Sequence, residues 1–164
     1  MTFITAEIGI NHNGSIEIAK KLIDVASSAG CDAVKFQKRN VEKVYLKKVL
    51  DTYRESMWGT TTREQKLGLE FSEKQYTKID QYCKKKKILW YLSCWDVGSQ
   101  IQMRKFKTKY NKVASAMLLH TKLLETIAEE GKYTFISTGM STMNEISNAV
   151  KIFLWSKATE ALHT

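Results

Sequence analysis

Three side chains in the sequence have the chemistry of an anion site. Lys35 lies in the apolar run "DAVKFQ", Lys112 in "NKVASA", and Ser137 in "YTFIST", just before the start of an expected helix. Ammonium groups, hydroxyls and the free N–H groups of a helix start all bind phosphate or carboxylate oxygens. A carboxylate, Glu7, lies in a further apolar run, "FITAEIG". These residue types predict a site for a phosphorylated or carboxylated ligand.

A structural interpretation of the same residues stays open. A lysine in a strand often lies on a solvated face, and Glu7 could form only an ion pair with one lysine. His12, in the turn "NHNG", and His120, before a helix, have ordinary uses as turn and surface residues. Cys94 lies at a strand end, but no histidine is placed to activate its thiol.

Alternating strand and helix patterns must position these residues. Apolar runs typical of buried strands occur at 3–9, 32–37, 88–93, 111–116 and 133–138. Helix patterns occupy 15–30, 71–87, part of 97–108, 121–131 and the stretch from 142. Five strand–helix units in tandem predict an α/β fold with a parallel sheet.

Local signals mark the ends of these elements. Ser72 with Gln75, and Thr142 with Glu145, fit capping boxes, and Phe71 and Tyr76 stand at the positions of a hydrophobic staple. The polar stretch 38–70 is too long for a routine connection and is a candidate functional loop. A further short strand is expected near 161–164. The last helix is expected to bury one face made of Met143, Ile146, Val150 and Phe153.

The fold class that fits is a TIM-type (β/α) barrel, left incomplete. Such barrels have eight units over about 250 residues, whereas 164 residues hold five to six. No G-x-G-x-x-G follows the first strand, so a dinucleotide fold has no specific support. We expect residues 1–164 to form one partial barrel domain. Its active-site rim would lie at the C-terminal strand ends, where the residues expected are Glu7, Lys35, Lys112, Ser115 and Ser137.

Composition narrows the class of protein. Apolar residues make up 43% of the chain, and no apolar run approaches the roughly 20 residues that span a bilayer. The first residues, "MTFITAEIG", lack the basic region and long apolar stretch of a secretory signal. The odd count of three cysteines favours reduced thiols and a cytoplasmic location. The net charge of +9 is concentrated in lysine runs without a nucleic-acid motif. We therefore expect no nucleic-acid and no membrane partner, and the positive charge suits an anionic small substrate.

Five stretches, in this order, resemble the sialic acid synthase family. They are "AEIGINHNG", "AKKLIDVASSAGCDAVKFQ", "FSEKQYTKIDQYCKKKKI", "NKVASAML" and "TFISTGMSTMNEI". The resemblance implies an enzyme that condenses phosphoenolpyruvate with N-acetylmannosamine or a similar amino sugar, giving N-acetylneuraminate and phosphate. It also implies an N-terminal (β/α)8 barrel, a small antifreeze-like domain after it, and a homodimer of the full-length protein.

The resemblance assigns roles to individual residues. Lys35 and Lys112 would hold the phosphoenolpyruvate anion, with Ser137 and Ser115 at the phosphate. Glu7 would lie near the sugar, and Asn11 in the first loop over the substrate. Catalytic roles would fall to Glu7, Lys35 and Lys112. A divalent metal, manganese before magnesium or cobalt, would act as a Lewis acid with His163 as one ligand.

This sequence departs from the family in what it lacks. The second metal histidine, the rest of the barrel and the antifreeze-like domain are absent from it. We therefore expect no turnover by these 164 residues alone. Two alternatives remain: a synthase for legionaminic or pseudaminic acid, or a non-catalytic half-barrel that self-associates or only binds an anion.

Overall fold

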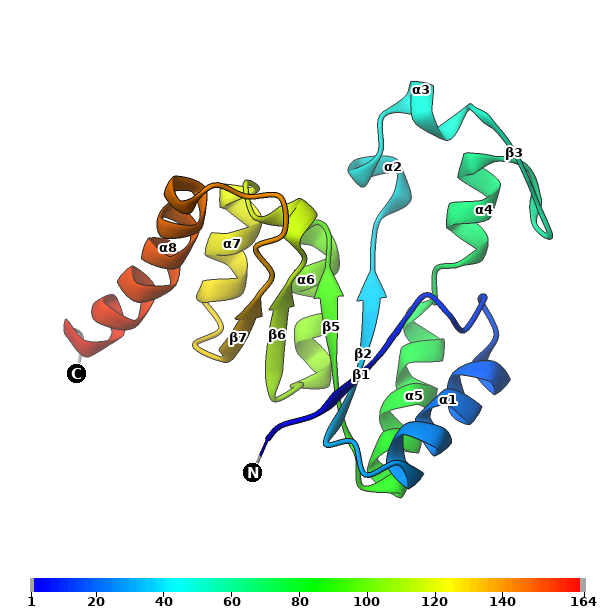
Figure 1. The fold of residues 1–164 in the computed structure, drawn as a ribbon, viewed down its shortest axis with the longest axis horizontal. Helices are drawn as coiled ribbons and strands as arrows, with labels where there is room; N and C mark the ends of the chain where they lie inside the picture. The colour runs from blue at the N-terminus through cyan, green and yellow to red at the C-terminus, as the bar shows by residue number, and fades with distance from the viewer. Residues whose placement is uncertain (1, 163–164) are drawn as a thin grey trace.

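Five parallel strands form one sheet at the centre of the protein (Figure 1). The computed structural model describes residues 2–162, of which residues 155–162 are described by their backbone alone. The strands follow the spatial order β1-β2-β5-β6-β7, and every neighbouring pair is parallel. Their bounds are Thr5–Gly9 (β1), Ala33–Lys38 (β2), Leu89–Cys94 (β5), Tyr110–Val113 (β6) and Tyr133–Ile136 (β7). The predicted parallel α/β sheet is confirmed.

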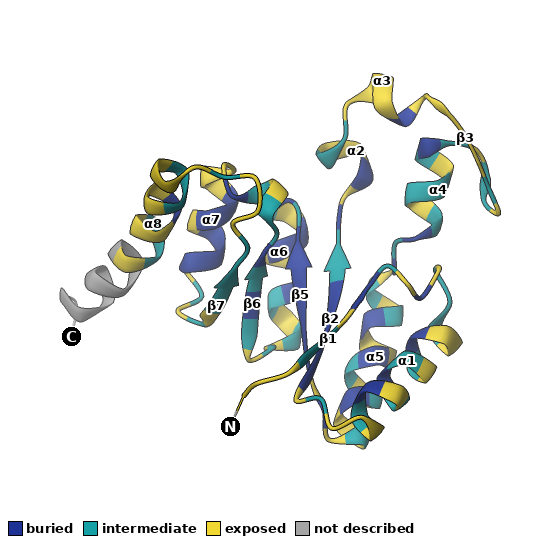
Figure 2. Cartoon of the chain, viewed as in Figure 1, coloured by how far each residue is buried: buried dark blue, intermediate teal, exposed yellow. Residues whose placement is uncertain are grey.

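Helices pack against one face of this sheet and enclose the core (Figure 2). Their bounds are Ile16–Ser28 (α1), Glu73–Lys86 (α5), Val97–Met103 (α6), Thr121–Ala128 (α7) and Met143–Leu162 (α8). Phe36 of β2 and Leu92 of β5 pack with Ile23 of α1 and Ile79 of α5 in one buried cluster. A second cluster joins β6 to α7 and α8. Burial of these apolar side chains against helices is what holds the strands in place.

Both capping boxes expected from the sequence are present. Ser72 accepts from the backbone N–H of Gln75, whose side chain accepts from the backbone N–H of Ser72. Thr142 and Glu145 make the same reciprocal pair at the start of α8. The rings of Phe71 and Tyr76 meet at 5.9 Å, as a hydrophobic staple requires.

The expectation of a loop over residues 38–70 was wrong. The stretch folds into α2 (Val41–Val44), α3 (Lys47–Leu50), a hairpin of β3 (Tyr53–Ser56) and β4 (Gly59–Thr61), and α4 (Thr62–Gly68). Each piece is too short to show a periodic pattern, and only α4 carries a capping box, between Thr61 and Glu64. We call residues 41–68 the excursion, because they leave the sheet and return to it (Figure 1).

Three smaller expectations also need correction. β6 ends at Val113, because residues 115–117 form a 3-10 helix (η2, Ser115–Met117). A second 3-10 helix (η1, Arg104–Phe106) follows α6 directly. Residues 161–162 extend α8 instead of starting a strand, and residues 163–164 lie outside the described residues. On α8, Ile146, Ala149 and Phe153 pack on the core. Met143 and Val150 are exposed, so the buried face was only half predicted.

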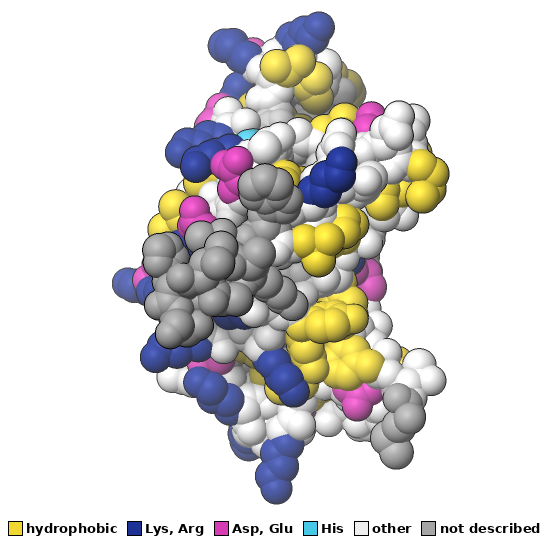
Figure 3. Space-filling view, turned by 90° about the vertical axis from the view of Figure 1, so that its left-hand side faces the viewer, with side chains coloured by type: hydrophobic (Ala, Val, Ile, Leu, Met, Phe, Trp, Pro, Cys, Tyr) yellow, Lys and Arg dark blue, Asp and Glu magenta, His cyan; other side chains and the backbone are white. Residues whose placement is uncertain are grey.

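The face of the sheet away from the helices is open to solvent at its lower end, as the molecule is oriented in Figure 1. Phe3, Tyr110, Tyr133 and Phe135 line a hollow of about 240 Å³ there, and hydrophobic side chains gather on this side of the molecule (Figure 3). In the part of the chain that the structure describes, β1 and β7 each pair with a single strand. The five strands therefore form an open sheet with two free edges.

Candidate functional site

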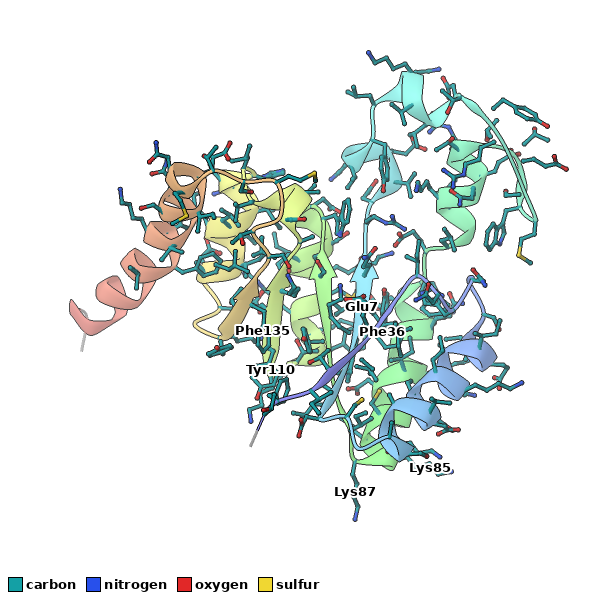
Figure 4. The ribbon with its side chains drawn as sticks, in the orientation of Figure 1. Glu7, Phe36, Lys85, Lys87, Tyr110 and Phe135 are labelled. Carbon is teal, nitrogen blue, oxygen red and sulfur yellow. The ribbon has the colours of Figure 1, made fainter. Side chains whose placement is uncertain are left out.

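The register of the strands brings the two predicted lysines to one face. Lys35 of β2 is in register with Glu7 of β1 and Tyr91 of β5, while Lys112 of β6 is in register with Ser93 of β5. Registered neighbours in a parallel sheet point to the same side, so all five side chains share the face away from the helices. Figure 4 shows Glu7 on β1, beside β2.

Lys35 is buried and forms an ion pair with Glu7. Its Nζ lies 2.8 Å from Oε2 of Glu7, and the lysine side chain is 7% exposed against 58% for the glutamate. The ion pair considered from the sequence alone is therefore real, but it opens to solvent on the carboxylate side. An exposed carboxylate contributes only about 1 kcal/mol to such a pair. The positive charge of Lys35 can still attract an anion.

Lys112 is hydrogen-bonded to neutral groups. Its Nζ donates to the carbonyl O of Val113 at 2.7 Å and to the hydroxyl of Ser137. Burial, and then the nearby charge of Lys35, lower the pKa of Lys112 to about 8. Two ammonium groups that destabilise each other are stabilised when an anion binds between them. This is the electrostatic signature expected of an anion site.

The two predicted serines lie just beyond the strands. Ser115 begins η2, and Ser137 follows β7 with its N–H bonded to the carbonyl O of Val113. A Cβ atom added to Gly139 would lie 3.8 Å from the Oγ atom of Ser115, so the loop after β7 lies against η2. The strand-end loops thus place the Ser137 hydroxyl on Lys112 and the Ser115 hydroxyl against the loop after β7.

Loop 1, residues 9–15, carries Asn11 and His12. Three successive turns shape it, through hydrogen bonds from the N–H groups of Asn11, Asn13 and Ser15 to carbonyls three residues earlier. Asn11 is exposed at this end of the sheet. His12 is 1% exposed, stacks on Phe71 at 3.9 Å and accepts the N–H of Gly14 at Nδ1. Its expected role as a turn residue is confirmed.

Two further residues are not part of the site. His120 caps α7 by accepting the N–H of Leu123 at Nδ1 and is exposed. Cys94 is buried, and burial raises the pKa of its thiol far above the ordinary value. A thiol that stays protonated is a poor nucleophile.

Ser93 is the residue that sequence reasoning missed. It is fully buried, in register with Gln37 on one side and Lys112 on the other. Among the described residues its hydroxyl has no hydrogen-bond partner. Such a hydroxyl costs free energy unless something binds it. The period-two pattern of "ILWYLS", once aligned with the lysine strands, would have placed it in the site.

Metal ligands are not found together in the described part of the chain. No group of three or more histidine, cysteine, aspartate or glutamate side chains there could hold a metal ion. His12 and His120 both have structural hydrogen bonds, and His163 lies outside the described residues. The described residues thus bring together a candidate anion site, and the proposed metal ligand lies outside them.

A separate hollow of about 450 Å³ lies between the base of the excursion and α6. Its cations Lys38 and Arg39 both face Glu70, with Arg39 Nε 2.7 Å from Glu70 Oε1. The carboxylate of Asp96 accepts hydrogen bonds from the neutral groups of Asn40 and Ser99. Paired charges leave little net field for a ligand. The lysine cluster is therefore the stronger candidate site.

The chain is similar to several known proteins over most of its length. N-acetylneuraminate-9-phosphate synthase from Drosophila melanogaster is 35% identical over 91% of this chain and 41% of its own length. N,N'-diacetyllegionaminic acid synthase from Campylobacter jejuni is 30% identical over 92% of this chain and 46% of its own. The structure of N-acetylneuraminic acid (sialic acid) synthetase from Leptospira borgpetersenii, in complex with citrate, has a TM-score of 0.82 at 29% identity, covering 94% of this chain and 50% of that one.

The chain spans about half the length of these relatives. A model of the NeuB family matches residues 22–163, which include Lys35, Lys112, Ser115 and Ser137. The sialic acid synthase resemblance found in the sequence is thereby confirmed. The chain belongs to the NeuB family.

Proposed function

We propose that this chain takes part in condensing phosphoenolpyruvate with N-acetylmannosamine or a similar amino sugar, to give N-acetylneuraminate and phosphate. One observation carries the proposal: Lys35 and Lys112 lie on one face of the sheet, near enough for the charge of Lys35 to lower the pKa of Lys112, in a chain of the NeuB family. Glu7 pairs with Lys35, and Ser137 with Lys112. A ligand with both a carboxylate and a phosphate is the kind that two adjacent ammonium groups favour.

The cationic, hydroxyl and carboxylate side chains would have different roles in the reaction. Lys35 and Lys112 hold the phosphoenolpyruvate anion, and Ser115 and Ser137 donate to its phosphate. C3 of phosphoenolpyruvate forms a bond to the sugar aldehyde carbon, water adds to the cationic C2, and the bond from C2 to the phosphate oxygen breaks. Glu7, with its exposed carboxylate, orients the sugar or that water and can accept its proton.

Asn11 and the metal complete the proposed site. Asn11 is exposed on loop 1 and would contact the substrate from there. A divalent metal, with manganese favoured over magnesium or cobalt, would supply Lewis acidity to the sugar aldehyde. His163 is its proposed ligand and lies outside the described residues, so the described geometry carries no step through the metal.

The domain is proposed to be part of a (β/α) barrel. β1 and β7 have free edges among the described residues, and the aromatic hollow of Phe3, Tyr110, Tyr133 and Phe135 lies on the face that a barrel encloses. Further strands would pair with both edges and cover these rings. The homodimer and the cytoplasmic location are part of the same proposal. In the described residues no helix is long and apolar enough to span a bilayer.

The choice of sugar stays open between named relatives. Synthases of N-acetylneuraminate-9-phosphate and of diacetyllegionaminic acid both match the chain at 30–35% identity. A synthase for legionaminic or pseudaminic acid is therefore the second candidate. A half-barrel that only binds an anion or self-associates is not favoured, because these relatives are named as synthases.

Calorimetry with phosphoenolpyruvate tests the anion site. The variant Lys35→Met/Lys112→Met should lose about tenfold or more in affinity. The control Lys85→Met/Lys87→Met removes the same charge from the far end of the molecule (Figure 4), and it should change affinity less than about twofold. Equal losses in the two variants would show that only net charge matters and would overturn the site.

Phosphate release tests the reaction. Phosphoenolpyruvate and manganese are incubated with N-acetylmannosamine, its phosphorylated form, or the legionaminic and pseudaminic acid precursors. We expect no release by the 164-residue chain alone, and release when the remainder of a NeuB-family barrel is supplied in the same polypeptide. Release by the chain alone would overturn that expectation and would also identify the sugar.

A further inference from the structure

Loop 1 has a backbone shape that few sequences can adopt. Gly9, Asn13 and Gly14 have φ values of 54°, 47° and 70°, all in the left-handed region. Left-handed residues cost free energy unless they are glycine or asparagine, or the surroundings fix them. Glycine or asparagine occupies all three positions, so the sequence permits this shape. Two sets of contacts then hold it.

The first set lies inside the loop. The imidazole of His12 donates a hydrogen bond to the backbone carbonyl of Gly9 and accepts one from the N–H of Gly14 at 3.1 Å. Its ring stacks on Phe71, at the start of α5. His12 therefore joins the two ends of loop 1 and ties them to the core.

The second set lies outside the loop, in the excursion. A Cβ atom on Gly14 would lie 2.2 Å from the carbonyl O of Gly68 and 3.8 Å from Cζ2 of Trp58. A Cβ atom on Gly68 would lie 2.2 Å from Cγ and Cδ1 of Trp58. Atoms this close exclude any side chain at either position. Gly14, Gly68 and the indole of Trp58 therefore pack directly on one another.

Trp58 is itself held in place. It lies in the turn between β3 and β4, where its backbone N–H donates to Ser56 Oγ at 3.3 Å. The carboxylate of Glu64 accepts from the N–H groups of Thr60 and Thr61, fixing the hairpin to the start of α4. The ring is half-buried in this frame. An anchored aromatic ring can transmit a fixed position to what it touches.

We propose that Trp58 is a positioning residue: through Gly68 and Gly14 it fixes loop 1, and with it the place of Asn11 over the substrate. The excursion then serves as a brace for the first loop of the site. The part of this inference that concerns ligand binding rests on the proposed function. The part that concerns loop order does not.

Hydrogen exchange tests the order of loop 1. In Trp58→Ala, the amides of residues 9–15 should exchange about tenfold faster than in the unaltered protein, while those of β2 and β5 stay unchanged. Trp58→Phe, which keeps a ring against Gly68, should restore slow exchange. The control Tyr53→Ala removes a 76% exposed ring from the same hairpin and should change nothing. Unchanged exchange in Trp58→Ala would overturn the brace.

A double-mutant cycle tests the link to Asn11. An amino sugar is titrated into the phosphoenolpyruvate-saturated protein for Asn11→Ala, Trp58→Ala and the double variant. If Trp58 acts through Asn11, each single variant weakens sugar binding by about tenfold, and the double variant is no worse than either. Additive losses would mean that Trp58 acts elsewhere and would overturn its role as a positioning residue.

The two arms fail separately. If the unaltered protein binds no amino sugar, the proposed function loses its acceptor substrate, and hydrogen exchange still decides whether Trp58 fixes loop 1. If the sugar binds but hydrogen exchange of loop 1 is unchanged in Trp58→Ala, the proposed function stands and the brace is wrong.

Discussion

The ammonium group of Lys35 lies 2.8 Å from the carboxylate of Glu7, whereas the ammonium group of Lys112 is bonded to the carbonyl of Val113 and the hydroxyl of Ser137. One carboxylate thus faces two cations. Lys35 is partly neutralised, and Lys112 carries the lowered pKa. The two lysines should therefore respond differently to changes at Glu7 and in pH.

Replacing Glu7 with glutamine should strengthen anion binding and abolish any condensation. Glu7→Gln removes a negative charge beside Lys35 without changing shape, so phosphoenolpyruvate should bind about threefold more tightly at low salt. Calorimetry measures the affinity. The matched control, Glu17→Gln, removes an exposed carboxylate from α1 and should have no effect. Weaker binding by Glu7→Gln would show instead that Glu7 holds Lys35 in its binding position.

Lys112 should make anion affinity depend on pH. With a pKa of about 8, its ammonium is fully charged only well below pH 8 and loses its proton as the pH rises through that value. Phosphoenolpyruvate affinity should therefore fall between about pH 7 and pH 9.5. Binding should also take up protons near pH 8, because a bound anion raises the pKa of the lysine.

Calorimetry in buffers of different ionisation enthalpy measures that proton uptake. Lys112→Met should bind more weakly and lose both the pH dependence and the uptake near pH 8. Lys87→Met, on the far end of α5 (Figure 4), should keep both. A pH profile that survives in Lys112→Met would assign the titration to another group.

His12 should make stability fall in weak acid. Burial lowers the pKa of His12 from 6.5 to about 4 in the folded protein. The unfolded chain then binds a proton that the folded one excludes, so stability is full above pH 6.5 and is lost as the pH falls toward 4. The loss is about 3 kcal/mol for a fully buried ring.

Urea unfolding at several pH values measures this loss. His12→Gln should be less stable at pH 7 and lose less stability between about pH 6.5 and pH 5, a window above the titration of most carboxylates. His120→Gln, which alters an exposed cap, should keep the full slope. An unchanged slope in His12→Gln would contradict the assignment.

The sequence predicted those parts of the fold that repeat a pattern. α5 was found with its cap at Ser72 and its staple of Phe71 and Tyr76, because these signals are local. The strands of Lys35 and Lys112 were found from short apolar runs, and period two then placed both lysines on one face. The family resemblance implied phosphoenolpyruvate as the ligand of the two lysines.

Contacts between distant segments could not be predicted in this way. No sequence pattern near Trp58 indicates that its ring packs on Gly68 and Gly14, because that contact joins the hairpin to loop 1. The burial of His12 depends on Phe71, which is far away in the chain. Ser93 became a site residue only when the register with Lys112 was known. Loops and buried polar groups are specified by tertiary structure, not by local pattern.

Ser93 offers a test that separates stability from binding. Its buried hydroxyl has no partner among the described residues, so Ser93→Ala should leave the free energy of unfolding unchanged or raise it slightly. If the hydroxyl binds the anion held by Lys112, the same variant should weaken phosphoenolpyruvate binding about fivefold.

Ser99→Ala is the matched control, because the buried Ser99 hydroxyl donates to Asp96 at 2.6 Å. It should cost about 1–2 kcal/mol of stability and leave the affinity unchanged. Urea unfolding and calorimetry on the two variants should therefore give opposite patterns, and unchanged affinity in Ser93→Ala would remove Ser93 from the site.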